Sequence, residues 1–409
     1  MDLADGVVGT AGQPSVSSPV GSAVSEGVPA VQRRRLSRHA KSWWIVVLAV
    51  LVLAAVWAAV HVVADRAFDE AASAVTVAAL TNRDATDSLR ALVDDASGAV
   101  EVSGVIVDAS SSAEDLVDAS ARAALSDAAA ASAGVVDEAA STLQDSVAAG
   151  DTRKPLWTWD LLTAAPRLTA NAAELGEYTD SLGTAQDAVE DASATLLDAA
   201  QDLYASVPPK AAALEAANVS ARAFVLLDLR EAAAAAAGQT GLGTGAATAF
   251  TTYAAKAANL THSQQVELAE KAGPLLATRL EIEEFARSIA GGVVLDFDWA
   301  PIVAGVGGSD GMGGTATWAV VRGGFSTITL SDSVAENWPS ADARALVAHE
   351  VGHAITSKCS DMFDSADADA NEAWATAWAI SMGHTAIGNG IQAYGYPPQA
   401  LIEKAATCR

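Results

Sequence analysis

Two histidines and a glutamate stand out in the stretch ARALVAHEVGHAITSKC, residues 343–359. The chain has only six histidines in 409 residues, yet His349 and His353 are four residues apart and Glu350 follows the first. On a helix, residues four apart project from one face, so both imidazoles can bind one metal ion. Glu350 is then placed to reach a water on the metal. The spacing predicts a zinc site, in which zinc lowers the pKa of its water to about 7 and the glutamate accepts a proton during attack on a peptide carbonyl.

A second motif follows the histidine pair. HEVGH is succeeded by NEAWATAW, residues 371–378, which contains Glu372. The two motifs together resemble the gluzincins, the thermolysin-like zinc metallopeptidases. The resemblance covers the C-terminal part of the chain, expected to be a small α+β zincin-like domain over residues 261–409. It implies Zn²⁺ as the cofactor, His349, His353 and Glu372 as the metal ligands, Glu350 as the general base, and a peptide or protein as the substrate.

The chain departs from the family pattern at one position. The family often carries an aspartate four residues after the third-ligand glutamate, where this chain has Thr376. We therefore expect a ligand histidine to be oriented by another group, Asp369 or Asp367. The family also implies a sheet whose edge strand binds extended substrate by β-augmentation. The segment STITL, residues 326–330, is the expected edge strand.

Several residues compete for the remaining roles. The alternatives to Glu372 as third ligand are Asp364, Asp367, Asp369 and His384. A peptidase also needs a hydrogen-bond donor for the transition state. His384 is the preferred catalytic residue beside Glu350, with Tyr394 and Tyr396 as the other candidates for this donor.

Two further hypotheses remain open. The first is a non-catalytic envelope adaptor or sensor with a degenerate zinc-binding domain. Glu350 argues against it, because a structural zinc site needs no base and usually has four protein ligands. The second is a metal-dependent amidase that acts on a cell-wall peptide.

The motifs must be positioned by a small set of elements. Ser340 is the predicted N-cap of the histidine helix. Strands are expected over residues 293–299, 315–321 and 326–330, the last two as a hairpin. The segment NEAWATAWAISM predicts a second helix with one buried stripe, and a separate face at Ala375 and Ala379 whose small residues allow the histidine helix to approach.

A long apolar segment precedes all of these elements. Residues 42–64 contain no Asp, Glu, Lys or Arg and are long enough to span a bilayer as a single transmembrane helix. A basic cluster, RRRLSRHAK, ends the predicted disordered tail of residues 1–41, and acidic residues follow the span. The positive-inside rule therefore predicts a cell-membrane protein with a cytoplasmic N-terminus and residues 65–409 outside. A cleaved signal peptide and a buried soluble helix are the alternatives.

The Ala- and Asp-rich middle, residues 65–260, is predicted to be a helical extracytoplasmic stalk. Leucine or valine recurs at strict seven-residue spacing from Leu168 to Leu203, which is typical of a coiled coil. Packing within one chain and packing in a homo-oligomer both fit this pattern. The helix is expected to begin at Pro166 and to end at VPPK, residues 207–210. The segment GDTRKPLWTW, residues 150–159, interrupts the helical pattern and predicts a hairpin turn or a docking point.

Charge and cysteine content restrict the remaining possibilities. The net charge of −26 argues against a nucleic-acid partner, because phosphate backbones require a basic surface. Cys359 and Cys408 are the only cysteines. Both lie on the predicted outer side, where disulfides persist, so a Cys359–Cys408 bond is expected, with two free thiols as the alternative.

Overall fold

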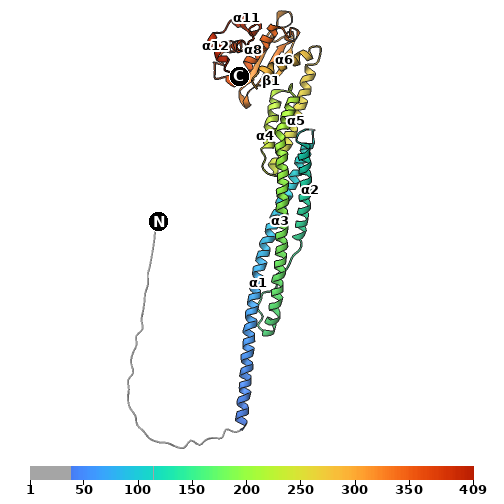
Figure 1. Ribbon diagram of the computed structural model, residues 1–409, viewed down its shortest axis with the longest axis vertical. Helices are drawn as coiled ribbons and strands as arrows, with labels where there is room; N and C mark the ends of the chain where they lie inside the picture. Colours follow the sequence, from blue (N-terminus) through green and yellow to red (C-terminus); the bar gives the residue numbers. More distant parts are fainter. Residues whose placement is uncertain (1–37, 114) are drawn as a thin grey trace, which may run out of the picture.

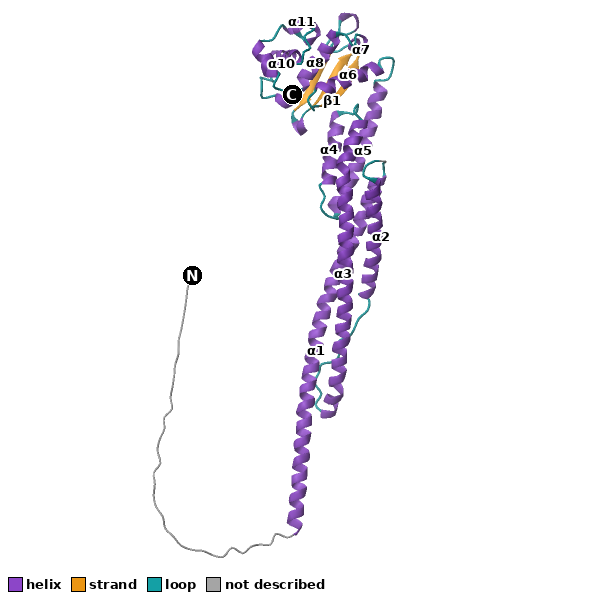
Figure 2. Ribbon diagram, viewed as in Figure 1, coloured by secondary structure: helices purple, strands orange, loops and turns teal. Residues whose placement is uncertain are grey.

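The computed structural model describes residues 38–113 and 115–409. The predictions for residues 1–37, which include most of the tail and of the basic cluster, lie outside the described residues. The described chain is mostly helical, with one small mixed sheet near the C-terminus (Figure 2). Figure 1 shows an elongated molecule: a compact head at one end, a long helical bundle, and the first part of one helix that extends alone beyond the bundle.

Five helices build the stalk: α1 (Arg38–Ser111), α2 (Ala119–Thr142), α3 (Thr158–Ala217), α4 (Ala223–Ala237) and α5 (Thr244–Glu270). The helices α1 and α3 run in parallel, because hydrogen bonds join residues that are a constant 97 positions apart. His61 Nδ1 bonds to Thr158 Oγ1 at 2.9 Å, and Asn82 Nδ2 donates to Thr179 Oγ1 at 3.3 Å. At about 1.5 Å per residue, the 60 residues of α3 extend roughly 90 Å and hold the head far from the start of the bundle.

The predicted heptad positions of α3 are buried inside this bundle. Each of the six residues is at most 5% exposed, and their neighbours lie on α1, α2, α4 and α5 of the same chain: Leu168, Leu175, Leu182, Val189, Leu196 and Leu203. The seam is therefore filled within one chain. The predicted helix ends are wrong, since α3 continues through Pro166, Pro208 and Pro209. Packing on both sides of these prolines sustains the helix despite the missing N–H groups.

The first part of α1 is long and apolar enough to span a membrane. With the exception of Val47, its large side chains from Trp43 to Trp57 are more than half exposed, and burial begins at Ala64. The predicted end of the span at residue 64 therefore coincides with the start of the bundle core, although α1 itself continues without a break.

The head contains a three-stranded sheet in the order β1-β3-β2, formed by β1 (Val294–Ala300), β2 (Gly314–Ala319) and β3 (Phe325–Ser331). β1 is parallel to β3, and β2 is antiparallel to it. The expectation that STITL forms the edge strand is wrong: β3 is central, because it pairs on both sides. The edge strand beside the histidine helix is β2.

Helices surround this sheet: α6 (Leu276–Ile289), α7 (Asp332–Glu336), α8 (Ala341–Ala354), α9 (Thr356–Cys359), α10 (Ala368–Ser381), α11 (Ile391–Tyr394) and α12 (Gln399–Ala405). The core of the head combines apolar side chains of α6, the sheet, α8 and α10, with Trp374 and Trp378 fully buried. The expected disulfide is present and joins Cys359 at the end of α9 to Cys408 near the C-terminus.

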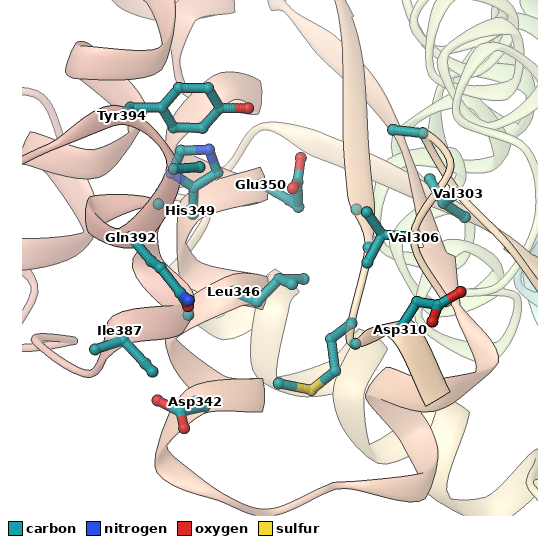
Figure 3. Close-up of a pocket in the computed structure, with 18 residues that line it drawn as sticks. Val303, Val306, Asp310, Asp342, Leu346, His349, Glu350, Ile387, Gln392 and Tyr394 are labelled. Carbon is teal, nitrogen blue, oxygen red and sulfur yellow. The ribbon is translucent and has the colours of Figure 1, made fainter. Parts of the chain in front are cut away.

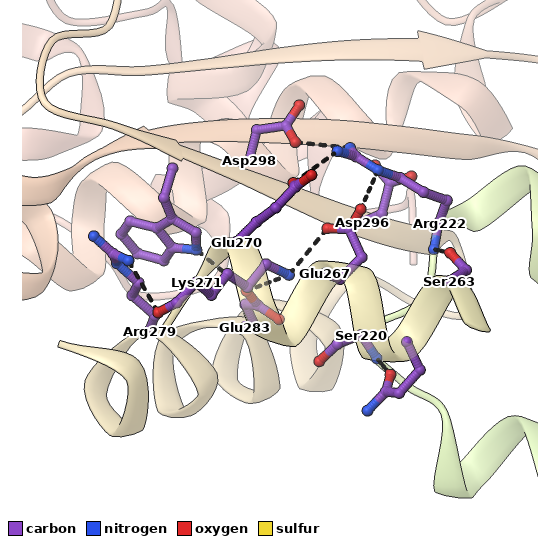
Figure 4. Close-up of polar contacts among 12 residues, drawn as sticks. Ser220, Arg222, Ser263, Glu267, Glu270, Lys271, Arg279, Glu283, Asp296 and Asp298 are labelled. Carbon is purple, nitrogen blue, oxygen red and sulfur yellow. Dashed lines mark hydrogen bonds and ion pairs between the residues drawn. The ribbon is translucent and has the colours of Figure 1, made fainter. Parts of the chain in front are cut away.

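A partly buried ionic network connects the head to the stalk (Figure 4). Arg222, just before α4, pairs with Glu267 of α5 and, at 2.7 Å, with Asp298 of β1. Lys271 lies 3.0 Å from the fully buried Glu283 of α6. The predicted domain boundary at residues 260/261 falls inside α5. The last helix of the stalk therefore also carries Glu267, a residue of this ionic network.

Candidate metal centre

The helix α8 presents the HEVGH motif toward the interior of the head. Ser340 caps it as predicted, because its side chain accepts a hydrogen bond from the N–H of Ala343 at 3.2 Å. His349, Glu350 and His353 are 5%, 4% and 7% exposed. Three polar side chains buried on one helix require partners, since an uncompensated buried polar group is strongly unfavourable.

The partner element is α10, which begins at its N-cap Asp367 and carries Glu372. Glu372 Oε2 lies 3.1 Å from His349 Nε2 and 3.3 Å from His353 Nε2. The two Nε2 atoms are 3.2 Å apart. Burial alone would raise the pKa of Glu372, but its hydrogen bonds to His349 and His353 outweigh burial and hold that pKa at about 2.

These three atoms form a nearly equilateral triangle that could hold a metal ion. Donor atoms about 2.1 Å from a tetrahedral zinc ion lie about 3.4 Å apart, close to the separations observed here. Two imidazole nitrogens and a carboxylate oxygen converge on one point, and their lone pairs repel unless a cation or proton lies between them. The residues therefore fit a metal ion bound through two nitrogens and one oxygen.

His349 is held in the orientation that such a site requires. Its Nδ1 lies 2.9 Å from the backbone carbonyl of Asn389, so an N–H there leaves Nε2 free for the metal. Thr376 Oγ1 also lies 3.3 Å from Nδ1, at the position where the family pattern has an aspartate. The expectation that Asp367 or Asp369 orients a ligand histidine is wrong: Asp367 caps α10 instead, and His353 Nδ1 is buried with no hydrogen-bond partner among the described residues.

Glu350 lies beside the triad and against the edge strand β2. A Cβ at Gly314 would lie only 2.5 Å from Glu350 Oε1, so a side chain at this position of the strand would displace the carboxylate. Glu350 Oε2 is buried and has no hydrogen-bond partner among the described residues. Burial raises the pKa of Glu350 above its ordinary value, although the neighbouring histidines oppose the effect. The free oxygen is available to a group that enters the site.

Two cavities meet at these residues. One has a volume of about 590 Å³ and extends from Glu350 past the glycine-rich loop of residues 303–314 and the segment 387–394 (Figure 3). The other, of about 340 Å³, extends along β2 to the start of α10. His349, Glu350, Gly314 and Tyr394 line both cavities. A chain molecule that occupied both cavities would pass directly over the triad.

The candidate donors lie in different places. The Tyr394 ring stacks on His349 with the ring centroids 6.0 Å apart, and Figure 3 shows its hydroxyl on the cavity side of that histidine. Burial raises the pKa of Tyr394, and the nearby carboxylates of Glu372 and Glu350 raise it further. His384 instead packs edge-on against Phe285 of α6, at 5.5 Å, and lines neither cavity. Tyr396 is 69% exposed and also lies outside both cavities.

The structure therefore brings together His349, Glu350, His353 and Glu372, but not His384, Asp364 or Asp369. Sequence reasoning missed Asn389 and Gly314. A backbone carbonyl such as that of Asn389 leaves no signal in residue type. The only sequence hint is the pair of glycines on either side of Asn389, which indicates a close backbone approach.

Comparisons with protein-family models, with curated proteins and with solved structures find no match to this chain.

Proposed function

We propose that the head is a zinc-dependent peptidase of gluzincin type, anchored to the cell membrane by α1 and carried outside the cytoplasm by the stalk. The observation that supports this function is the triangle of His349 Nε2, His353 Nε2 and Glu372 Oε2, with separations of 3.1–3.3 Å. Zinc suits two imidazoles and a carboxylate, and a catalytic site keeps one further position open. When bound, zinc supplies an acidified water and polarises the carbonyl of the substrate.

Residues of the chain supply the general base, the hydrogen-bond donor and the strand that binds the substrate. Glu350 is the general base, since its buried Oε2 has no protein partner and can accept a proton from a nucleophile. Tyr394 is the proposed hydrogen-bond donor to the substrate oxygen, in place of His384, because it lines both cavities. The edge of β2 offers unpaired backbone groups to an extended peptide, because β3 occupies only its other side.

The decisive experiment replaces only the base. Glu350→Gln in the full chain is expected to retain zinc and to lower peptide hydrolysis by about 10²–10⁴-fold, the usual contribution of a general base. The matched control is Glu284→Gln, an exposed position on α6. Zinc content is measured by elemental analysis and hydrolysis with a peptide library. Peptide hydrolysis by Glu350→Gln at the wild-type rate would contradict the assignment of Glu350 as the general base. Zinc binding without hydrolysis in the unchanged protein would favour the adaptor hypothesis.

A further inference from the structure

The turn that enters α3 exposes an unusual amount of apolar surface. We refer to residues 153–159 as the aromatic turn. Leu156 is 90% exposed, Trp157 72% and Trp159 76%. Trp157 and Trp159 are the only tryptophans between residues 58 and 298. Isolated exposed apolar residues are ordinary, but three within four positions form a patch that normally contacts another surface.

The exposed tryptophans of the described chain follow a pattern. The three in α1, namely Trp43, Trp44 and Trp57, are 58–65% exposed and lie within the apolar segment. The five tryptophans of the head are buried or partly buried. The aromatic turn is therefore the one place outside the apolar part of α1 where the described residues expose tryptophan to this extent.

Two contacts fix the height of the aromatic turn along α1. The Thr158 hydroxyl bonds to His61, near the end of the apolar segment. Lys154 pairs with Asp65 at 2.6 Å and with Asp69 at 2.8 Å, one and two helical turns further along. The charged start of the turn thus lies level with the first acidic residues, and its aromatic end lies level with the last apolar residues.

This height matches the boundary of a bilayer. The 21 residues from Trp43 to Val63 extend about 31 Å, close to the roughly 30 Å thickness of the hydrocarbon core. When Trp43 lies at one boundary, His61 and therefore Trp157 and Trp159 lie at the other. Tryptophan is enriched at such boundaries because its ring is apolar and its N–H remains solvated.

We infer that the aromatic turn inserts into the interfacial layer of the same membrane that α1 spans, with Leu156, Trp157 and Trp159 among the lipid headgroups and upper acyl chains. The occupant of this patch is lipid. The contact gives the stalk a second attachment beside α1 and so restricts its tilt relative to the membrane. The inference rests on the membrane span of α1 but not on the peptidase activity.

Site-directed spin labelling of the full chain in lipid vesicles tests this placement. Both native cysteines are paired in the disulfide, so an introduced cysteine is labelled selectively. Leu156→Cys keeps both tryptophans, and Trp159→Cys provides a second position. Val56→Cys within the span and Val77→Cys on the exposed part of α1, 14 residues beyond Val63, are the matched references. The measurement compares relaxation of the label by lipid-soluble oxygen with relaxation by a water-soluble nickel chelate.

The expected result is that the labels at positions 156 and 159 are less accessible to the nickel chelate than the label at 77 and more accessible than the label at 56, as an interfacial depth requires. Labels at 156 and 159 that meet the chelate as freely as the label at 77 would overturn the inference alone. A label at position 56 that is accessible to the chelate would contradict both the membrane span of α1 and the lipid contact of the aromatic turn. Dipolar broadening between labels at 159 that persists on dilution into excess lipid would assign the patch to a second copy of the chain and overturn the lipid contact.

Discussion

Gly352 of α8 packs closely against Ala375 of α10, the helix that carries Glu372. A Cβ at this position would lie 2.7 Å from the backbone oxygen of Ala375 and 2.8 Å from its Cα. Ordinary carbon contacts are about 3.5–4.0 Å, so Gly352→Ala requires the two helices to separate by roughly 0.7–1 Å. Both Ala375 atoms belong to the backbone, so they cannot move aside by a side-chain rotation.

Two effects on stability oppose each other. Alanine is favoured over glycine in a helix by about 1 kcal/mol, whereas overpacking a core costs about 1–3 kcal/mol. The free energy of unfolding should therefore change by between roughly 0 and −2 kcal/mol. Metal affinity should respond more strongly, because ligand distances in metal sites must hold to about 0.2 Å. We expect a loss of about 10–100-fold in zinc affinity, as for substitutions that disturb the support of a ligand.

Zinc affinity is measured by competition with a chromophoric chelator, and stability by denaturant unfolding of the full chain in detergent. Gly176→Ala in α3 is the matched control, since a Cβ there meets nothing within 4 Å. It should raise stability by up to about 1 kcal/mol without any effect on zinc. If Gly352→Ala behaves like Gly176→Ala in both assays, the close packing of α8 against α10 does not position the metal-binding side chains.

Three other substitutions or treatments test the third metal ligand, the disulfide and the orientation of the chain in the membrane. Glu372→Ala should lower zinc affinity by about 10²–10³-fold, because one ligand's share of the 10–16 kcal/mol of a four-ligand site is about 2.5–4 kcal/mol. Asp369→Ala should not change zinc affinity in the same titration. The reverse pattern would move the third ligand to the aspartate-rich loop. Serine at both Cys359 and Cys408 should lower the free energy of unfolding by about 4 kcal/mol, because the bond closes a loop across 49 positions; an unchanged denaturation midpoint would contradict this. Protease added outside intact cells should remove the head, and its protection would reverse the proposed orientation.

The sequence alone determined the features that belong to single elements. Helical periodicity places His349 and His353 one turn apart whatever surrounds the helix. The same reasoning identified the buried heptad positions of α3 and the apolar segment at the start of α1. It also indicated that Ala375 belongs to the face of α10 that meets the histidine helix, because small residues permit close packing. These inferences succeed because a period within one helix is a local property of the chain.

Only the tertiary structure decided which distant groups meet. Glu372 is 23 positions from His349 and Asn389 is 40, and no local pattern specifies which acid or carbonyl faces each ring nitrogen. Strand order was also undetermined, because β2 and β3 form the same hairpin whether β1 pairs with one or the other. The pairing of β1 with β3 leaves β2 at the edge beside Glu350. Tyr394 lines the cavities and the predicted His384 does not, for the same reason. Packing between elements sets the path of the chain after α10, and that path decides which side chain lies near His349, His353 and Glu372.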